Sequence, residues 1–527
     1  MSKTTYLAKR TFRVVVSVML VIALLLTTSL IGVNAATDQP KGEISFNKTF
    51  YDTHKEVCDK IAQGIENLDT EIYIGEYHLT SSEIANIMKT VIRMHPEFFY
   101  VITTRCMIGT DGTYVTVLCP FYRYSNAEIA NYKKTLDKKI AEIIALTNDS
   151  MTDFQKAIII HDQVILNCAY DDTEIVEEDT ATKEKITSDR VTSYDALIRG
   201  RANCQGYTNA FTYLLSLVGV NSEVVESGTM DHIWTKVCID NTYYNVDPTW
   251  DDPVQDNFGH VSHTYFLVSD DGFKNGINGS SIHSGFNTAY YKSNNTKYDN
   301  GFFRDIDTRF CYVGTDFYVI DNTYGSKYEK CLLKYNPETE SIEKLVAFDY
   351  KWDNESGTGY WKGGYMSLDI YNGGLYFNTP DSVYRYDIAR KTSSCVISSK
   401  SKTTTKLYFG LLINSIGEIH VAENTNPNNA DTVAFIGNCP TDPKNSNVFE
   451  ADVLVTVPVS EIIYGDVNGD GKVRINDATI IQKYAVAKET LDADALVRAD
   501  VNKDTRVNVM DATRIQCYTS GIINTFG

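Results

Sequence analysis

Positive charge is scarce in this chain of 527 residues. Lysine and arginine total 49 against 68 aspartates and glutamates, so the formal net charge is −19 at pH 7. Nucleic acids and anionic membranes bind basic surfaces, so this balance argues against both as partners. The length predicts several domains, each large enough to bury a core of its own.

Long hydrophobic runs are also scarce, and Val14–Leu26 is the one that approaches the length of a bilayer span. The small residues Val33-Asn34-Ala35 follow it, and four basic residues precede it: Lys3, Lys9, Arg10 and Arg13. This order predicts a secretory signal peptide, residues 1–35, cut after Ala35; an uncleaved anchor is the alternative. Because no second candidate span follows, we expect a mature protein that is soluble outside the cell and has no stable membrane association.

A disulfide pattern is the third feature that the chain lacks. The 11 cysteines are odd in number and scattered in spacing, and a chain of this length does not need covalent staples. We therefore expect mostly free, buried thiols, with Cys204 as the exposed exception.

One stretch, residues 201–253, contains Cys204, His232 and Asp247 in an order that suits thiol acyl chemistry. Cys204 opens a segment that ends at Gly219 and has apolar residues at helical spacing: Tyr207, Ala210, Phe211, Leu214, Leu215 and Val218. A thiol at the start of a helix lies beside the positive end of the helix dipole and the first-turn amides. Both favour the thiolate, and the amides offer a donor to an oxyanion.

The histidine and the aspartate lie on two alternating segments on either side of Asp240-Asn241, which predicts an antiparallel hairpin. If the turn centres on this pair, His232 faces Thr249 and Asp247 is its diagonal neighbour. A longer turn would place His232 and Asp247 directly opposite. In either register Asp247 can orient the imidazole while His232 draws the proton from Cys204, and no cofactor is expected for catalysis.

Taken singly, these residues have ordinary explanations. A cysteine is usually a small buried hydrophobe or half of a disulfide, and a lone histidine on a strand is usually structural. The combination favours catalysis. Three strings carry a resemblance to the transglutaminase-like superfamily, in particular to its secreted bacterial branch: Asn203-Cys204-Gln205-Gly206-Tyr207, His232-Ile233-Trp234 and Asn245-Val246-Asp247-Pro248-Thr249-Trp250-Asp251-Asp252-Pro253.

The resemblance extends beyond these strings. His95-Pro96-Glu97-Phe98-Phe99-Tyr100 is similar to a segment ahead of the core in the same branch, so the similarity covers roughly residues 44–286. Tyr265–Ser269 and His283 are expected closing features of the family core. One departure is Thr235, which stands where that branch usually has asparagine.

Helical periodicity predicts four helices before the cysteine: Tyr51–Leu68, Ser81–Met94, Asn126–Ala145 and Asp153–Asn167. Phe98–Thr104 and Tyr114–Tyr124 alternate as strands do. His161 is expected to be a packed structural histidine, with a role in supporting the catalytic site as the alternative. The acidic segment Asp171–Arg190 predicts an irregular surface loop over the site.

The segment Phe302–Val457 has short tyrosine-rich alternating runs and almost no helical periodicity. We expect three strand pairs, which are Phe317–Asp321 with Leu332–Asn336, Leu375–Thr379 with Val383–Asp387, and Leu407–Ile413 with Glu418–Ala422. The distance from Tyr335 to Tyr386 suggests a repeat of about 50 residues, as in propeller blades. Three blades cannot close a ring, so the prediction is an incomplete propeller-like or a sandwich-like domain. Its role is left open between contact with a polymer and a passive spacer.

An acidic twelve-residue segment, Asp466–Asp477, recurs as Asp500–Asp511. Oxygen ligands at loop positions 1, 3, 5 and 12, with a backbone carbonyl at position 7, suit Ca²⁺. The predicted ligands are Asp466, Asn468, Asp470, Lys472 and Asp477 in the first loop and Asp500, Asn502, Asp504, Arg506 and Asp511 in the second. Position 6 is Gly471 in the first loop and Thr505 in the second, so the first is expected to bind more tightly. Aspartate at position 12 differs from a sensor EF-hand.

Each loop precedes a helix, Ala478–Tyr484 or Ala512–Tyr518, and no helix is expected before the loop. This duplication resembles a dockerin, the module that attaches bacterial enzymes to cohesin-bearing scaffolds. A repeated acidic turn on a solvated surface would not explain the matching helices. The resemblance implies two Ca²⁺ ions as cofactors, a cohesin module of a scaffoldin as partner, and a location on a cell-surface cellulosome.

The two resemblances together imply an α+β protein. Its expected domains after the signal peptide are a mixed extension (36–150), a transglutaminase-like, papain-like catalytic core (151–300), a β-rich domain (301–458) and a small helical dockerin (460–527). We expect a thiol enzyme that forms a thioester at Cys204 and hydrolyses peptide or amide bonds of proteins. The alternatives are transamidation that cross-links glutamine to amines, a catalytically inactive polymer-binding protein, and an unrelated surface protein. The intact triad favours an enzyme.

Overall fold

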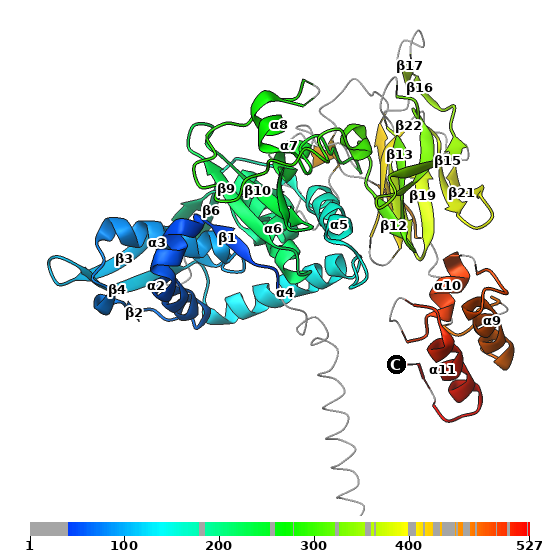
Figure 1. Cartoon of the computed structure of the whole chain (residues 1–527), viewed down its shortest axis with the longest axis horizontal. Helices are drawn as coiled ribbons and strands as arrows, with labels where there is room; N and C mark the ends of the chain where they lie inside the picture. Colours follow the sequence, from blue (N-terminus) through cyan, green and yellow to red (C-terminus); the bar gives the residue numbers. More distant parts are fainter. Residues whose placement is uncertain are drawn as a thin grey trace, which may run out of the picture.

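The computed structural model describes residues 41–526 except 179–184, 253–258, 278, 322–325, 354–359, 363–364, 399–406, 415–416, 425–432, 435–447, 450–451, 457–463, 470–471, 492, 503–505 and 524. The predicted signal peptide lies outside these residues. In Figure 1 the N-terminal α/β part lies on the left, the strands of residues 311–456 on the right, and helices α9 to α11 below those strands.

The N-terminal part packs two helices against a three-stranded sheet of order β2-β4-β3. Its elements are α2 (Lys48–Glu66), β2 (Ile72–Tyr73), α3 (Ser81–Met94), β3 (Val101–Thr110), β4 (Val115–Tyr122) and α4 (Asn126–Ile144). A reciprocal capping box of Thr80 and Glu83 starts α3, because each side chain accepts an orphan amide of the other residue. The predicted helices are confirmed, and the first predicted strand begins three residues later than expected, at Val101.

The central sheet has the order β1-β9-β10-β11. These strands are β1 (Ile44–Phe46), β9 (Ser222–Ser227), β10 (His232–Ile239) and β11 (Thr242–Val246). Asp240 and Asn241 both have positive φ, and Ile239 pairs with Thr242, so the turn contains two residues of the kind that hairpin twist favours. The first of the two predicted registers is therefore the one found.

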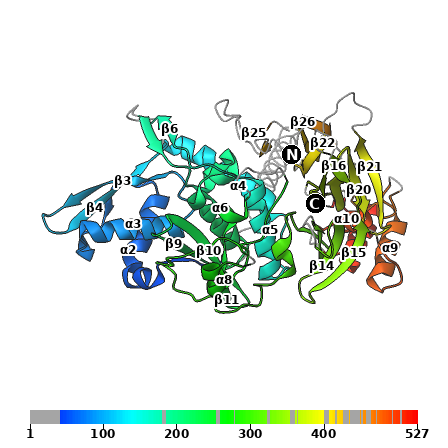
Figure 2. The ribbon, with the colours of Figure 1, turned by 90° about the horizontal axis from the view of Figure 1, so that it is seen from above.

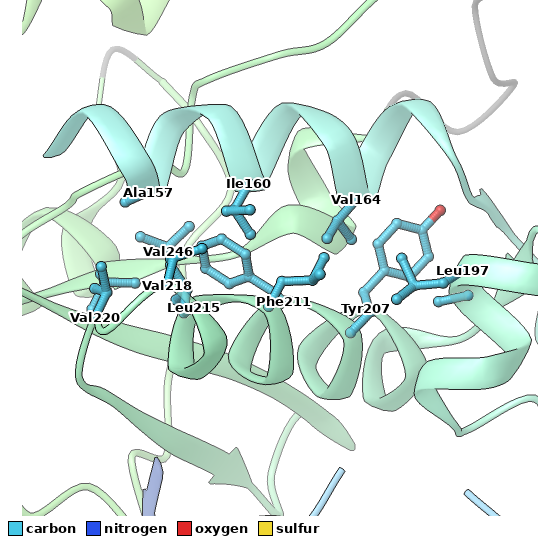
Figure 3. Close-up of a cluster of buried hydrophobic side chains, with 14 of the residues drawn as sticks. Ala157, Ile160, Val164, Leu197, Tyr207, Phe211, Leu215, Val218, Val220 and Val246 are labelled. Carbon is cyan, nitrogen blue, oxygen red and sulfur yellow. The ribbon is translucent and has the colours of Figure 1, made fainter. Parts of the chain in front are cut away.

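Two helices, α5 (Asp153–Leu166) and α6 (Cys204–Leu217), pack against each other beside this sheet. Figure 3 shows their apolar side chains directed into one layer: Ala157, Ile160 and Val164 from α5, and Tyr207, Phe211 and Leu215 from α6. All six are fully buried. Burying such side chains stabilises the fold by roughly 1.5–3 kcal/mol each for the larger ones, which fixes the start of α6 relative to the sheet.

The acidic segment 171–190 is more regular than predicted. β6 (Ile175–Glu178) and β7 (Lys185–Ser188) form an antiparallel hairpin, so the expectation of an irregular loop is wrong for these residues. Both strands contain adjacent β-branched residues, Ile175-Val176 and Ile186-Thr187, and their strand propensity outweighs the acidic composition. The short strands β5 (Ala169–Tyr170) and β8 (Arg201–Ala202) pair in parallel immediately before Cys204.

Residues 311–456 form three multi-stranded antiparallel sheets, and the three predicted strand pairs are confirmed. The first two sheets contain β12 (Cys311–Val313), β13 (Asp316–Asp321), β14 (Cys331–Asn336), β15 (Ser341–Ala347), β18 (Leu368–Tyr371), β19 (Gly374–Asn378), β20 (Ser382–Asp387) and β21 (Thr392–Ser398). The third contains β22 (Leu407–Ile413), β23 (Glu418–Asn424) and β26 (Asp452–Thr456). Two-stranded pairs join β16 (Lys351–Asp353) to β17 (Tyr360–Lys362) and β24 (Val433–Ala434) to β25 (Val448–Phe449).

The first two of these sheets repeat one pattern. Each is a four-stranded meander, and Tyr335 and Tyr386 occupy the same strand in each, paired with Phe317 and Leu375. Figure 2 shows the strands of this region gathered on the side of the molecule away from β3 and β4. Among the described residues these two four-stranded sheets and the three-stranded sheet β22-β23-β26 are fewer than the four blades of the smallest propellers, so the region is blade-like without a closed ring.

The first blade-like sheet shares its core with the central sheet. Phe310, Phe317 and Leu333 belong to the same buried cluster as the side chains of α5 and α6. Backbone contacts accompany this packing, because Val261 donates to the carbonyl of Asp307 at 3.1 Å and His260 bridges to Thr308. The two regions are therefore joined by a continuous apolar core, and the predicted boundary near residue 300 stays a prediction.

The C-terminal helices are α9 (Ile475–Ala485), α10 (Ala493–Ala499) and α11 (Val509–Thr519), and they enclose a small core of their own. The helices after both loops are confirmed, whereas α10, which precedes the second loop, was not predicted. No helix in the described part of the chain is long and apolar enough to cross a bilayer.

The cysteines agree only partly with expectation. The ten that the structure describes are all free, and five of them are buried. Cys106 and Cys395 are the exposed ones, whereas Cys204 is half-buried, so the expectation that Cys204 is the exposed exception is wrong. Cys204 is half-buried because its side chain packs against the apolar cluster that contains Phe46 and Ile233.

Candidate active site

Cys204 is the first residue of α6. Asn203 caps this helix, and its Oδ1 accepts the amides of Gln205 at 3.0 Å and Gly206 at 3.4 Å. A Cβ on Gly206 would lie 2.4 Å from the Cβ of Ala202 and 3.1 Å from the carbonyl oxygen of Arg190. Only glycine therefore allows the first turn to pack this closely against β8, which fixes the direction of the thiol.

His232 begins β10, and its Nε2 lies 2.6 Å from Oδ2 of Asp247. Asp247 ends the hairpin and caps α7 (Pro248–Asp251), where its Oδ1 accepts the amides of Thr249 at 3.0 Å and Trp250 at 3.4 Å. The cap turns the aspartate out of the strand ladder and toward His232, which explains how a diagonal pair comes into contact. The sequence-predicted pair is therefore brought together.

The third predicted residue also reaches the histidine. Cys204 lies close enough to His232 to add to the influence of the carboxylate on the imidazole. Burial lowers the pKa of His232, but Asp247 and then Cys204 outweigh burial and raise that pKa to about 10. Burial raises the pKa of Asp247, but His232 and His283 outweigh it and hold that pKa well below its usual range. The geometry therefore favours a charged imidazole beside the thiol.

A fourth residue, His283, joins this group. Its Nε2 lies 2.8 Å from the same Oδ2 of Asp247 that His232 contacts. The ring is fully buried and stands between Phe273 and Trp250, each with a centroid distance of 4.1 Å. His283 was predicted only as a closing feature of the core. It lies on an irregular segment 36 residues beyond Asp247, where no periodic pattern signals its position.

The surroundings of the thiol are apolar on one side and polar on another. Phe46 of β1 and Met94 of α3 belong to the cluster that Cys204 contacts, so the N-terminal part supplies one wall of the site. The exposed phenol of Tyr170 lies within electrostatic reach of Cys204 and Asp231. Thr235, the departure from the family pattern, is buried, and its hydroxyl has no hydrogen-bond partner among the described residues.

A zinc ion does not fit between His232, Asp247 and His283. Zinc ligands lie about 2.0–2.1 Å from the ion, so tetrahedral ligand atoms are about 3.3 Å apart. The two histidine nitrogens lie 2.6 and 2.8 Å from the carboxylate oxygen, which are hydrogen-bond lengths. The group therefore suits proton positioning rather than metal coordination.

A second buried group of the same residue types lies behind α7. His161 contacts Asp162 Oδ1 at 3.0 Å and Asp251 Oδ2 at 3.1 Å through its two ring nitrogens. His263 contacts Asp162 Oδ1 at 2.9 Å and the carbonyl of Ile306 at 2.8 Å. His161 is thus a packed residue, as predicted, but it is packed within an ionic group rather than an apolar one.

The two C-terminal loops share one geometry. In the first loop Asp477 accepts the amides of Asn468 at 3.1 Å and Arg474 at 2.8 Å. Asp511 accepts the amides of Asn502 and Asn508 at 3.4 and 2.9 Å in the second. Buried carboxylates at the first and last positions of a loop, such as Asp466 and Asp477, are costly without a cation, so the residues fit Ca²⁺.

Part of each predicted ligand set cannot be placed. Asp470, Gly471, Asp504 and Thr505 lie outside the described residues. The expected difference in affinity between the loops depends on Gly471 and Thr505, and it stays a prediction.

Comparison with protein families identifies both regions. Residues 139–248 match the transglutaminase-like superfamily, and residues 464–518 match the dockerin type I domain. The chain therefore combines a transglutaminase-like domain, which contains Cys204, His232 and Asp247, with a C-terminal type I dockerin. Such a domain indicates a thiol-type enzyme, and a dockerin implies attachment to a cohesin on an extracellular cellulosome. A search of curated proteins found no match.

Solved structures similar to the chain fall into the same two groups. In a complex from Acetivibrio cellulolyticus, the third cohesin of ScaC holds the ScaB dockerin with a mutated C-terminal helix; the match has 38% identity, 12% coverage of this chain, 86% of that chain and a TM-score of 0.11. The complex with a mutated N-terminal helix matches with 35% identity, covers 12% of this chain and 90% of that chain, and has a TM-score of 0.12. A structure described as a TGase has 13% identity, covers 32% of this chain and 48% of that chain, and has a TM-score of 0.18.

Proposed function

We propose that this protein is an exported, scaffold-attached thiol enzyme that hydrolyses peptide or amide bonds of proteins. The observation that carries the proposal is the line of contacts from Cys204 through His232 to Asp247, with Cys204 at the capped start of a buried helix. A histidine that is charged and oriented by a carboxylate is the partner that a nucleophilic thiolate needs.

In the proposed resting enzyme the proton of the Cys204 thiol has already passed to His232, and in the first step the thiolate of Cys204 attacks the amide carbonyl. The carbon–nitrogen bond then breaks, His232 returns its proton to the departing amine, and a thioester remains on Cys204. Water attacks the thioester while His232 accepts a proton, which releases a carboxylate and restores the thiol. The amides of Gln205 and Gly206 already donate to Oδ1 of Asn203. The amide of Cys204 is therefore the first-turn donor best placed to stabilise the oxyanion.

The test is hydrolysis of a labelled protein mixture by the wild-type chain and by Cys204→Ala. We expect new peptide amino termini with the wild type and none with the variant. A primary amine added in excess distinguishes the acceptors, because transamidation would incorporate it into glutamine side chains. Equal activity of the wild type and Cys204→Ala would rule out the thiol mechanism.

The dockerin supplies the proposed attachment. Ile475 at the start of α9 and Val509 at the start of α11 occupy equivalent positions in the two repeats, and both are more than half exposed although apolar. Exposed apolar side chains at matched positions mark a protein-binding surface. We expect Ile475→Asp to weaken capture by a cohesin domain in the presence of Ca²⁺, and hydrolysis by the same variant to stay unchanged.

A further inference from the structure

We infer that His283 is a positioning residue for the proposed reaction, which holds Asp247 in place by donating a second hydrogen bond to the oxygen that contacts His232. This inference rests on the proposed function and adds a residue that acts through the aspartate. The distances of 2.6 and 2.8 Å from one Oδ2 place both imidazoles on a single acceptor.

The protonation state of His283 follows from its surroundings. Its Nε2 faces a carboxylate that the backbone amides of Thr249 and Trp250 and the ring of His232 also contact, so Nε2 must donate. Its Nδ1 is buried and has no hydrogen-bond partner among the described residues. Nε2 of His283 is therefore the donor of the hydrogen bond to Asp247, and its Nδ1 lies in apolar surroundings.

The ring of His283 is fixed from several directions. Its backbone amide donates to the carbonyl of Phe273 at 2.7 Å, and the ring packs against Phe273, Trp250, Tyr265 and Trp234. An immobile donor limits rotation of the Asp247 carboxylate. With two amides on Oδ1 and two imidazoles on Oδ2, the carboxylate keeps one orientation, and His232 keeps the ring orientation that faces Cys204.

The role predicts different effects for two substitutions. His283→Phe fits the aromatic surroundings but removes the donor, whereas His283→Gln keeps an N–H at about the same reach. A hydrogen bond to a charged group contributes enough that its loss should slow the reaction about tenfold, equivalent to about 1.4 kcal/mol. Because His283 does not contact the thiol, the loss should lie in kcat and leave KM nearly unchanged.

The experiment measures alkylation of Cys204 by iodoacetamide in the full chain at neutral pH, followed by mass spectrometry of the Cys204 peptide. Cys106 and Cys395 are exposed and serve as internal references. We expect Cys204 to react about tenfold more slowly in His283→Phe and within about threefold of wild type in His283→Gln. His260→Phe is the matched control, since His260 is also a buried histidine but lies on the segment whose backbone pairs with Thr308, away from Asp247 in the sequence and the sheet. His283→Leu replaces the phenylalanine variant if that variant does not fold.

Four results would overturn the inference. They are equal slowing in the Phe and Gln variants, no slowing in a folded Phe variant, equal slowing in the His260→Phe control, and zinc-dependent recovery of the wild type after chelation. Failure of the proposed function looks different, because Cys204 of the wild type would then react no faster than Cys106 and Cys395.

Discussion

Two buried groups in this molecule combine two histidines with a shared aspartate, and only one of them contacts a nucleophile. In the first, His232 and His283 share Asp247. In the second, His161 and His263 share Asp162. Residue types are the same in both groups, and the contacts to the shared aspartate are all of hydrogen-bond length, 2.6 and 2.8 Å in the first and 3.0 and 2.9 Å in the second. Neither feature by itself therefore indicates a catalytic site.

The difference lies in what occupies the remaining ring nitrogens. In the second group both nitrogens of His161 face carboxylates, and the second nitrogen of His263 faces the carbonyl of Ile306. Asp162 also accepts the amide of Phe310 at 2.7 Å, which ties the group to the start of the β-rich region. In the first group His232 has one ring nitrogen on Asp247 and contacts the thiol of Cys204. A buried imidazole can serve catalysis when one nitrogen is left for a reacting group, and otherwise it joins parts of the fold.

The largest effect on activity is expected from Asp247→Asn. The amide keeps Oδ1 for the cap of α7 but places an N–H₂ group against His232 and His283, so the imidazole is forced into the wrong tautomer. The turnover of the folded protein should fall by roughly 10⁴-fold, and because the substitution also breaks a buried pair, the thermal unfolding temperature should fall as well. Steady-state hydrolysis and calorimetry on the same sample measure both quantities. A folded Asp247→Asn protein with near-wild-type turnover would contradict the role of the first group.

The corresponding change in the second group, Asp162→Asn, should act on stability instead. Removing the carboxylate leaves His161 and His263 buried without their shared partner, and breaking a buried ion pair costs about 3–5 kcal/mol of unfolding free energy. Denaturant titration measures the loss, and Cys204 alkylation in the remaining folded protein should be unchanged. Asp59→Asn is the matched control, since it alters an exposed ion pair with Lys55 that is expected to contribute under about 1 kcal/mol. A stability loss no larger than that of the control would show that the second group is dispensable.

The hairpin and the helix start were predictable because local chemistry determines them. Asp240-Asn241 is a pair that tolerates positive φ, so it predicted the turn and limited His232 to two registers, of which the structure has the first. Asn203 is a preferred helix cap and positioned Cys204 in the same way. The second histidine at each aspartate was not predictable. His283 and His263 lie 36 and 101 residues from Asp247 and Asp162, on segments without helical or strand periodicity, and only tertiary packing brings them in.

The β-rich region shows the same limit. The strand pairs could be predicted from alternation within a few residues, and their repeat from the spacing of Tyr335 and Tyr386. The sequence did not predict the continuous core that joins Phe310 and Phe317 to the helices of the catalytic region. Apolar residues on a strand do not specify which distant surface they will contact.

A smaller effect should separate the two groups by pH. Burial lowers the pKa of His161, but Asp162 and Asp251 outweigh it and raise that pKa to about 9. A raised histidine pKa stabilises the fold fully below the unfolded value of about 6.5, and that stabilisation is lost as pH rises through about 9. The pKa of His232 is about 10, so its charged form should persist to higher pH. Unfolding temperature should therefore begin to fall at lower pH than kcat/KM does. Parallel pH titrations test this, and a common midpoint for the two curves would contradict it.

The smallest expected effect is that of a chelator on either histidine group. Both groups are closed by direct hydrogen bonds of 2.6 to 3.1 Å, which leave no room for a zinc ion. Removal of divalent metals should therefore change the rate of Cys204 alkylation by less than about twofold. It should change the unfolding temperature of the catalytic region by less than about 1 °C. The dockerin provides the positive control within the same chain. Its loops place the carboxylates of Asp477 and Asp511 where a calcium ion is needed, so the same chelator should abolish capture by a cohesin, and Ca²⁺ should restore it. Loss of thiol reactivity on chelation, restored by zinc but not by calcium, would mean that the first group is a metal centre and that its likeness to the second is superficial.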